Sequence, residues 1–149
     1  MTSALHIRLY EETDYENVVA LWNECGLLRP WNDPAEDISL CRRTASSELW
    51  VGVFGENESP TVVVATIMTG SDGHRGWLYY LAVDQKFQRN GFARAMVRYA
   101  ENWLAGQGVR KVELMIRDDN NPVRTFYERV GYETEPRIVM SRWLKDHDT

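Results

Sequence analysis

Residues 79–96 read YYLAVDQKFQRNGFARAM, and this stretch decides the fold. It starts within an apolar run, Trp77 to Val83, that predicts a buried strand. After a short loop, Gly91 opens an amphipathic helix that extends through Ala105. No acidic residue stands in the first turn of this helix, so its unpaired backbone N–H groups and the positive end of its dipole favour an anion. The segment therefore predicts a strand, a loop and a helix start that can bind an anionic group.

Small and basic residues strengthen this interpretation. Gly91 lets a ligand approach the backbone closely, and Ala93 is small enough to do the same. Lys86, Arg89 and Arg94 add positive charge around the helix start. The loop has neither the lysine–serine pair of a P-loop nor a GxGxxG motif, which makes a Rossmann-type nucleotide enzyme a weak alternative. We interpret the loop as a pyrophosphate cradle, while noting that a plain strand–helix turn also accounts for a glycine there.

Composition and charge exclude several classes of protein. The 149 residues predict one domain, residues 1–149. The 22 acidic and 17 basic residues give a net charge of −5, which argues against a nucleic-acid partner. The longest apolar run, Val62 to Ala65, is far shorter than the roughly 20 residues of a membrane helix. Cys25 and Cys41 form no CxxC pair and no secretory signal is visible, so we expect a cytoplasmic protein.

The rest of the chain supplies further strands and helices. Strand patterns cover residues 6–10, 49–54, 61–69, 111–117, 132–134 and 138–144, the last two as a hairpin around Pro136. Helices are expected from a Thr13–Glu16 capping box to Gly26, from Pro34 with Asp33 as cap to about Ser46, and from Asn121 as cap to Gly131. A strand–helix–strand crossover in the middle makes the fourth and fifth strands parallel neighbours. The predicted fold class is α/β (α+β): four helices on a mixed, mostly antiparallel seven-stranded sheet.

Two motifs resemble those of a known family. The pattern Gln88-x-x-Gly91-x-Ala93 after an apolar strand, and Asn120 followed by FYERVGY at 126–132, are similar to the landmarks of the GNAT superfamily of acyl-CoA N-acyltransferases. The expected order of elements agrees from end to end, so the resemblance covers nearly the whole chain. RPWNDP at 29–34 and DGHRG at 72–76 resemble the bacterial YpeA-like subgroup of uncharacterised acetyltransferases. The resemblance implies that the fourth and fifth strands splay apart.

The resemblance also implies a cosubstrate, acetyl-CoA, and its contacts. Leu81, Ala82 and Val83 match the strand whose backbone pairs with the pantetheine arm of acetyl-CoA. Asn120 matches an asparagine that contacts the cofactor. The residues that match the pyrophosphate-binding loop and helix start are Gln88, Arg89, Asn90, Gly91, Phe92, Ala93 and Arg94. The implied function is an acetyl-CoA-dependent N-acetyltransferase that acts on an amine of a small molecule or peptide by direct transfer in a ternary complex. The alternative is a non-catalytic acyl-CoA-binding module.

Acetyl transfer passes through a tetrahedral oxyanion and releases a thiolate. A backbone N–H near the carbonyl stabilises the oxyanion, and a bulge in the fourth strand at residues 81–83 is where we expect one to be freed. A phenol can protonate the departing thiolate, and the resemblance implies that Tyr127 faces the thioester sulfur. The spacing 123, 126, 127, 130 equally places Tyr127 on the apolar stripe of a helix, so a core tyrosine is the open alternative.

The base that accepts the amine proton is left unassigned. Relatives that acetylate protein N-termini often carry a glutamate on the fifth strand, where Met115 stands here. The substitutes are Asp72, His74, Tyr79, Tyr80 or a chain of water molecules. Both cysteines are expected to be small packed hydrophobes rather than nucleophiles. His6, His74 and His147 lack ligand spacing, so no metal site is predicted.

By the same resemblance, the acceptor wall is expected at LLRPWNDPAEDI, residues 27–38, between the first two helices. Arg29 and Trp31 either contact the substrate or pin this loop by packing. The acidic chain mildly favours a cationic amine. Neither nucleic acid nor a membrane is expected as a partner, and an aromatic content of 11% leaves room for a homodimer surface.

Overall fold

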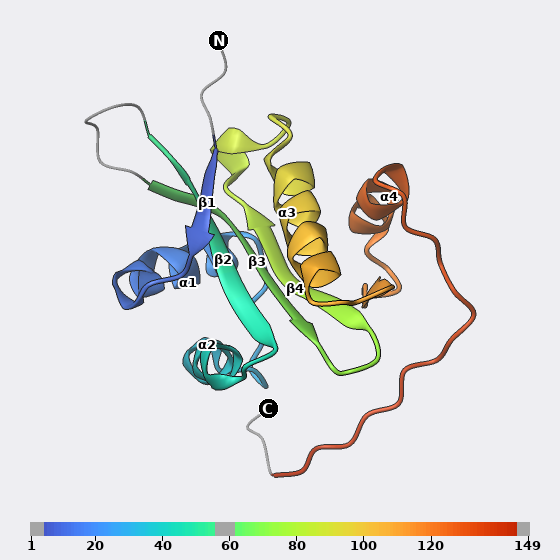
Figure 1. Cartoon of the computed structure of the whole chain (residues 1–149). Coiled ribbons are helices and arrows are strands. Elements are labelled where there is room, and N and C mark those ends of the chain that lie inside the picture. The colour runs from blue at the N-terminus through green and yellow to red at the C-terminus, as the bar shows by residue number, and fades with distance from the viewer. Residues whose placement is uncertain (1–4, 56–61, 146–149) are drawn as a thin grey trace.

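One mixed sheet forms the centre of the molecule. The computed structural model describes residues 5–55 and 62–145, so Thr61 and His147 lie outside the described residues. Five strands follow one another in chain order across the sheet: β1 (His6–Leu9), β2 (Ser47–Phe54), β3 (Val62–Ser71), β4 (Gly76–Val83) and β5 (Val112–Leu114). Neighbouring strands are antiparallel except β4 and β5, which are parallel as predicted (Figure 1).

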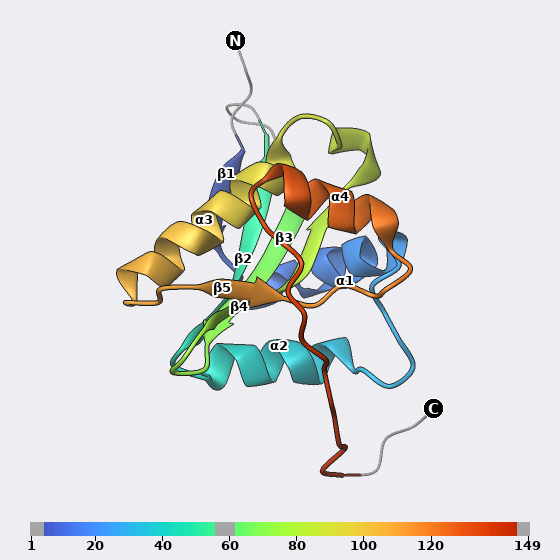
Figure 2. The same ribbon diagram turned by 90° about the vertical axis from the view of Figure 1, so that its right-hand side faces the viewer.

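Four α-helices cover the two faces of the sheet: α1 (Tyr15–Glu24) and α2 (Pro34–Arg43) on one face, α3 (Phe92–Gly106) and α4 (Asn121–Arg129) on the other (Figures 1 and 2). Each face has its own apolar cluster, with Trp22 and Ile38 in the first and Met96 and Leu104 in the second. A sheet covered on both faces explains why β2 and β3 are almost continuously apolar. In the described part of the chain, no helix is long and apolar enough to span a membrane.

The local sequence signals predict the start of α2 correctly but not the start of α1. The predicted cap of α2 is confirmed, because Asp33 Oδ1 accepts hydrogen bonds from the N–H groups of Ala35 (2.9 Å) and Glu36 (3.4 Å). The predicted Thr13 cap is wrong. A short 3₁₀ turn, Glu12–Asp14, precedes α1, and the helix begins only at Tyr15.

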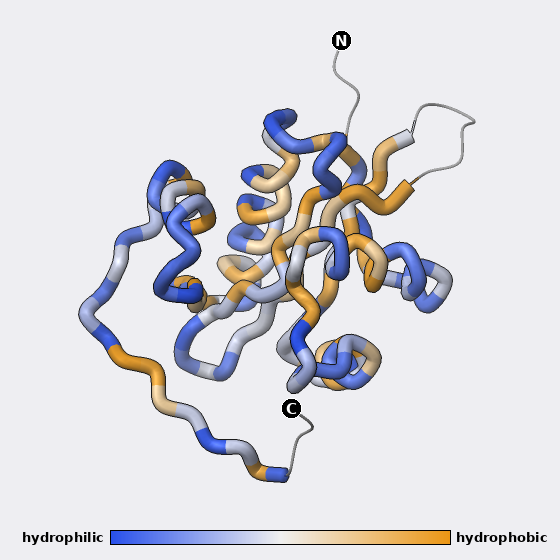
Figure 3. The backbone as a smooth tube through the Cα atoms, turned by 180° about the vertical axis from the view of Figure 1, so that it is seen from behind, coloured by the Kyte–Doolittle hydropathy of each residue, from blue (hydrophilic) through white to orange (hydrophobic). Residues whose placement is uncertain are grey.

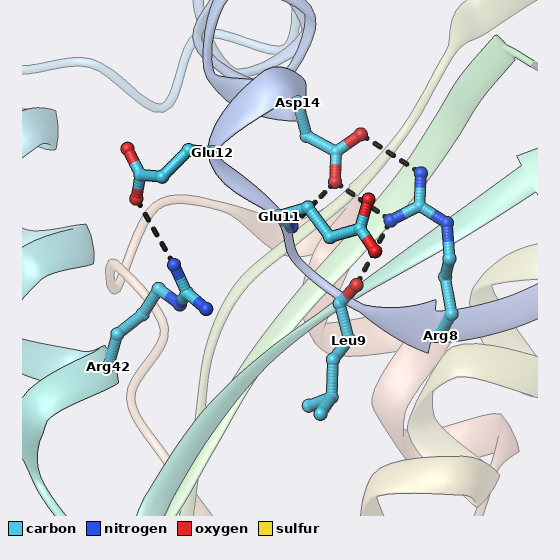
Figure 4. A network of polar contacts seen from close by, with 6 residues as sticks. All are labelled: Arg8, Leu9, Glu11, Glu12, Asp14 and Arg42. Atoms are coloured by element: carbon cyan, nitrogen blue, oxygen red, sulfur yellow. Dashed lines mark hydrogen bonds and ion pairs between the residues drawn. The ribbon is translucent and has the colours of Figure 1, made fainter.

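Polar contacts of Asp14, the residue after Thr13, account for this difference (Figure 4). The Asp14 carboxylate accepts hydrogen bonds from Arg8 Nη1 (2.8 Å), Arg8 Nη2 (3.0 Å) and the backbone N–H of Glu11 (2.8 Å). Burial by itself would raise the pKa of Asp14, but these hydrogen bonds outweigh it and hold that pKa below its ordinary value. Arg42 of α2 pairs with Glu12 at 3.1 Å. A capping box formed by Glu11 and Asp14, together with the ion pair to Arg8, therefore takes the place of the predicted Thr13–Glu16 box.

The prediction of seven strands is wrong. Residues 132–134 and 138–144 form no strand, and β5 is shorter than the predicted 111–117. After α4 the chain leaves the sheet as an extended segment (Figure 2). A strand needs a neighbour to pair its backbone groups, and the alternating pattern of residues 138–144 supplies the side chains without supplying that neighbour.

Candidate cofactor and acyl-transfer site

The parallel strands β4 and β5 separate part of the way along β4. Their pairing ends where Leu78 lies opposite Leu114, whereas β4 continues to Val83. Within the described residues, this last part of β4 pairs with β3 on one side only. The backbone of Leu81–Val83 is therefore open towards β5, and the splay implied by the sequence is present. An extended chain can add to such an open strand edge.

A β-bulge interrupts β4 at the opening of this wedge. Thr66 pairs with Ala82 and Met68 with Tyr79, so Tyr80 and Leu81 share one position opposite β3. Tyr80 has a φ of 54°, a left-handed conformation that is uncommon for a tyrosine. A bulge in β4 is thus present, but it lies at Tyr80–Leu81 and overlaps the predicted residues 81–83 only at Leu81. A bulged residue leaves the regular ladder, which frees backbone groups for another partner.

Side chains from α1 and β3 hold the bulge in place. The Thr66 hydroxyl donates to the Tyr80 carbonyl at 2.8 Å and accepts from Trp22 Nε1 at 2.9 Å. The Trp22 ring stacks on the Tyr80 ring with centroids 3.8 Å apart. Because Trp22 and Thr66 are completely buried, the unusual conformation is fixed by the surrounding core.

The end of β4 leads through a 3₁₀ turn, Gln85–Phe87, into the start of α3. Gly91 is the N-cap of α3, with φ 79°, and a Cβ atom built on it meets nothing within 4 Å. The backbone N–H groups of residues 92–94 find no acceptor among the described residues. The space in front of Gly91 is open, and the donors of the first helical turn point along the helix axis towards it. These are the features that an anion site at a helix start requires.

Three phenylalanine rings pack together beneath the backbone of residues 87–92. The ring centroids of Phe87 and Phe92 are 6.1 Å apart. The Phe54 ring of β2 packs against both, with its centroid 5.0 Å from that of Phe87 and 6.0 Å from that of Phe92. The Phe92 side chain is 9% exposed, so only its backbone is placed to meet a ligand. Phe54 gave no signal in the sequence, because it lies more than 30 positions before the motif, and Phe87, directly before Gln88, was not singled out.

The polar residues of the motif divide into two groups. Gln88 Nε2 donates to the Val83 carbonyl at 3.4 Å and Asn90 Nδ2 to the Phe87 carbonyl at 3.1 Å, so both side chains brace the loop itself. Lys86, Arg89 and Arg94 are exposed and form no ion pair or side-chain hydrogen bond with another described residue. Their positive charge is therefore available to a ligand.

Tyr127 lies on α4 with its ring in the second apolar cluster, 6% exposed. The Tyr127 hydroxyl has no hydrogen-bond partner among the described residues. Two other side-chain atoms there, Tyr10 Oη and Trp50 Nε1, are both fully buried and without a partner, but the Tyr127 hydroxyl is not fully buried. The hydroxyl oxygen therefore reaches solvent at the edge of a buried ring. Burial raises the pKa of Tyr127 above the ordinary value of a phenol, so the proton stays in place at neutral pH. The ring belongs to the core, as the alternative predicted, and the hydroxyl remains accessible.

A shallow cavity of 540 Å³ lies between the α1–α2 loop and the loop after β5, lined by Arg29, Trp31, Arg117, Asp119 and Asn120. The Arg117 guanidinium stands 5.7 Å from the centre of the Trp31 ring. Neither Arg29 nor Arg117 forms an ion pair or a hydrogen bond from its side chain within the described part of the chain. Trp31 therefore has a packing partner, whereas Arg29 is placed to meet a ligand.

Asn120 borders this cavity and also starts α4. Its Oδ1 accepts a hydrogen bond from the N–H of Val123 at 3.3 Å, which makes Asn120 the N-cap. The predicted cap at Asn121 is wrong by one residue, because Asn121 is the first helical residue. The side-chain amide of Asn120 has no partner among the described residues and remains a donor for a ligand.

Two of the candidate bases are too far from the bulge. Asp72 and His74 belong to the turn between β3 and β4, at the opposite end of β4. Hydrogen bonds from the backbone N–H groups of Arg75 and His74 and from Trp77 Nε1 lower the pKa of Asp72 to about 2. Asp72 is a turn-forming carboxylate, and the turn holds His74 beside it.

Tyr80 brings an unpredicted partner to the bulge. Its hydroxyl donates a hydrogen bond of 2.6 Å to Asp37 Oδ2 on α2, and both residues are half-buried. Burial, together with the Asp37 carboxylate, raises the pKa of Tyr80. The Tyr80 phenol thus keeps its proton, and its oxygen still has lone pairs. The Tyr80 oxygen can therefore accept a proton from a substrate while the hydroxyl proton moves to Asp37. No sequence pattern pointed to Asp37, because it lies 43 positions before Tyr80.

The cysteines are free thiols that pack as small groups. Cys25 Sγ lies 3.5 Å from the Val83 carbonyl, and Cys41 is buried. Burial raises the pKa of both thiols, which makes them poor nucleophiles. In residues 5–55 and 62–145, no group of three His, Cys, Asp or Glu side chains is placed to hold a metal ion.

Comparisons with known proteins agree with this geometry. Residues 8–132 match the family described as the acetyltransferase (GNAT) family. An acetyltransferase of Yersinia enterocolitica is 39% identical over 140 residues, covering 94% of this chain and 96% of that protein. Among solved structures, an aminoglycoside N-acetyltransferase in complex with CoA superposes with a TM-score of 0.77 at 16% identity, covering 97% of this chain and 98% of that one. A glucosamine-6-phosphate N-acetyltransferase of Arabidopsis thaliana gives a TM-score of 0.69 at 19% identity, covering 95% and 99%.

Proposed function

The chain belongs to the acetyltransferase (GNAT) family and is an acyltransferase, and from this premise we propose that it transfers the acetyl group of acetyl-CoA directly to an amine in a ternary complex. One observation carries the proposal: the bulge, the open backbone of β4 and the open start of α3 follow one another within residues 80–94. This order matches the thioester, the pantetheine arm and the pyrophosphate along one extended cosubstrate.

The binding residues have distinct roles in this proposal. The backbone of Leu81, Ala82 and Val83 pairs with the pantetheine arm, and Asn120 contributes its free amide. The N–H groups of residues 92–94, in front of Gly91, meet the pyrophosphate, with Arg89 and Arg94 supplying charge. Gln88 and Asn90 act indirectly, since their side chains brace the loop.

The chemical step needs three groups near the bulge. An N–H freed at Tyr80–Leu81 stabilises the oxyanion that forms as the amine nitrogen attacks the thioester carbonyl. The Tyr80–Asp37 pair accepts the proton that the amine loses when the C–N bond forms. Tyr127 donates a proton to the thiolate as the C–S bond breaks. After transfer Asp37 holds the amine proton and Tyr127 has lost its own, so solvent takes one proton from Asp37 and returns one to Tyr127 before the next turnover.

The acceptor enters through the cavity lined by Arg29 and Arg117. Neither guanidinium group is paired with an acid in the part of the chain that the structure describes, although Asp119 lines the same cavity. The two groups therefore favour an amine that also bears a carboxylate or phosphate, such as an amino acid or a peptide end. This local charge opposes the preference for cationic amines that the whole-chain charge suggested. The free thiols of Cys25 and Cys41 support a cytoplasmic location for the reaction.

The release of free CoA thiol tests this function. With acetyl-CoA present, thiol release should rise when the right member of a panel of amino acids, peptides, polyamines and aminoglycosides is added. A panel that gives no amine-dependent release, while calorimetry shows acetyl-CoA bound, would favour the alternative of a non-catalytic acyl-CoA-binding module.

A further inference from the structure

Strand β3 carries two buried hydroxyl groups in the middle of an apolar sheet. The hydropathy colouring shows the central strands as largely apolar (Figure 3), yet Thr66 and Thr69 of β3 are 0% and 1% exposed. Each hydroxyl donates a hydrogen bond to a backbone carbonyl of β4, Thr66 to Tyr80 at 2.8 Å and Thr69 to Trp77 at 2.9 Å. Trp77 lies in regular pairing with β3, whereas Tyr80 lies in the bulge. The two contacts are therefore chemically alike, but only that of Thr66 acts on irregular backbone.

A hydrogen bond from α1 fixes the direction in which the Thr66 hydroxyl donates. Trp22 Nε1 donates to Thr66 Oγ1 at 2.9 Å. An indole N–H can only donate, so this contact occupies an acceptor position of the hydroxyl and leaves its one proton for the Tyr80 carbonyl. Trp22 and Thr66 are both completely buried, so bulk water does not compete for either hydrogen bond. The Tyr80 carbonyl is thereby held against β3.

The Tyr80 carbonyl and the Leu81 N–H belong to one peptide group. This peptide bond is trans, so the carbonyl and the N–H point in opposite directions. A Tyr80 carbonyl that is held against Thr66 therefore leaves the Leu81 N–H pointing away from β3. The pairing beyond the bulge agrees, because the Asp84 N–H donates to the Val64 carbonyl of β3 at 2.8 Å. Alternate residues of a strand turn their backbone groups to opposite sides, which also places the N–H of residue 81 on the side away from β3.

From these observations we propose that Thr66 is a positioning residue for acyl transfer. Its hydroxyl, fixed by Trp22, sets the Tyr80–Leu81 peptide group so that the Leu81 N–H faces the thioester carbonyl. This inference rests on the proposed function, in which an N–H of the bulge stabilises the oxyanion. Thr66 is completely buried and acts only through the backbone of β4. A donor that is oriented in advance needs no reorganisation when the carbonyl oxygen gains negative charge.

Infrared spectroscopy of bound acetyl-CoA, labelled with ¹³C at the acetyl carbonyl, tests this role without turnover. In the wild-type chain, the hydrogen bond from Leu81 should lower the carbonyl stretching frequency relative to free acetyl-CoA. Thr66→Val keeps the shape of the side chain without its hydroxyl and should lose most of this shift, whereas Thr66→Ser should retain it. Thr69→Val is the matched control, since it removes a buried hydroxyl from the regular part of the same ladder, and should keep the wild-type frequency.

Single-turnover kinetics make the same comparison for the chemical step. Thr66→Val should lower the rate by about 10- to 100-fold, at or below the usual loss for removing an oxyanion donor, and Thr66→Ser should restore most of it. The KM for acetyl-CoA should be little changed. Both valine variants should lower the melting temperature, so this measurement separates a loss of stability from a loss of positioning.

Several results would overturn the role of Thr66. One is a bound wild-type frequency equal to that of free acetyl-CoA, and another is a wild-type frequency in Thr66→Val. Equal losses of rate in Thr66→Val and Thr69→Val would make the role structural only. If Thr66→Val does not fold, Trp22→Phe replaces it, because the hydroxyl then lacks the indole donor that fixes its direction.

The same spectra distinguish this inference from the proposed function. A wild-type chain that shows the shifted frequency, and loses it in Thr66→Val, but releases no thiol with any amine would contradict the proposed function and still support the role of Thr66. A wild-type chain that does not bind acetyl-CoA would overturn both.

Discussion

Residues 76–83 and residues 138–144 both have the apolar pattern of a strand, but only the first segment forms a strand in the structure. Residues 76–83 lie between β3 and β5 and pair with both, whereas residues 138–144 lie beside no described strand. The difference shows that an alternating pattern predicts which side chains a strand would present, while pairing decides whether the strand exists. The incomplete pairing at the end of β4 is what creates the candidate site.

The largest effect on acetyl-CoA binding is expected at Gly91, where the backbone at the start of α3 is open to a ligand. Gly91→Glu places a side chain in the open space, strains a φ of 79° and adds negative charge beside the phosphates. Acetyl-CoA binding, measured by calorimetry, should be lost. Gly26→Glu is the matched control, since it also has a positive φ and open space but lies at the end of α1. Wild-type affinity in a folded Gly91→Glu variant would exclude this cradle.

Tyr127→Phe should slow the chemical step by about 10²–10⁴-fold, the usual contribution of one positioned acid. The ring stays in the second cluster, so acetyl-CoA affinity and melting temperature should change little. Single-turnover kinetics at saturating acetyl-CoA measure the step directly, because slow product release can hide it in the steady state. Tyr99→Phe, which removes the hydroxyl of an exposed tyrosine on α3, is the control and should leave the rate unchanged. A rate within about threefold of wild type would make Tyr127 a core residue only.

Asp37→Asn and Tyr80→Phe should lower kcat to a similar extent, about 10²-fold, if the pair accepts the amine proton. Tyr80→Phe retains the stacking on Trp22, so the bulge should persist. The rate of both variants should recover as pH rises and the free amine becomes the main form of the acceptor. Glu36→Gln on the same helix is the control. Unequal losses, or a pH profile like that of the wild type, would remove the pair from the proton path.

Arg29→Ala and Arg117→Ala should each raise the KM for the acceptor by about 10-fold, the loss of one charge-assisted hydrogen bond. The KM for acetyl-CoA should be unchanged, which separates acceptor binding from cofactor binding. Arg110→Ala, an exposed arginine before β5, should leave both constants unchanged. An effect on acetyl-CoA alone would assign the cavity to the cofactor.

The smallest effect concerns stability. Because the pKa of Asp14 is lower in the folded than in the unfolded chain, its stabilisation is present above the unfolded value, about 4, and is lost as pH falls through the folded value. Asp14→Asn should reduce the free energy of unfolding at pH 7 by about 1–3 kcal/mol. Urea titrations at pH 7 and pH 3 should show that the difference from wild type shrinks in acid. A difference that is constant with pH would mean that the Arg8 ion pair contributes nothing.

The sequence predicts features that depend on near neighbours and misses those that depend on distant ones. The cap at Asp33, the strands β2 to β4 and the start of α3 at Gly91 follow from local chemistry and agree with the structure. The start of α1 depends on Arg8 meeting Asp14, and the bulge depends on Trp22 and Thr66. The Tyr80–Asp37 pair joins two elements whose separation in sequence hides their contact. The last two expected strands pair with no described strand, and the sequence holds no local signal for that absence.

A crystal structure with bound acetyl-CoA tests the proposed site. The pyrophosphate should lie at the N–H groups of residues 92–94, in front of Gly91, and the pantetheine arm along Leu81–Val83. The thioester carbonyl should lie at the Tyr80–Leu81 bulge, with the thioester sulfur next to the Tyr127 hydroxyl. Phosphates bound at Arg29 and Arg117 instead, with the β4–β5 wedge empty, would contradict this arrangement.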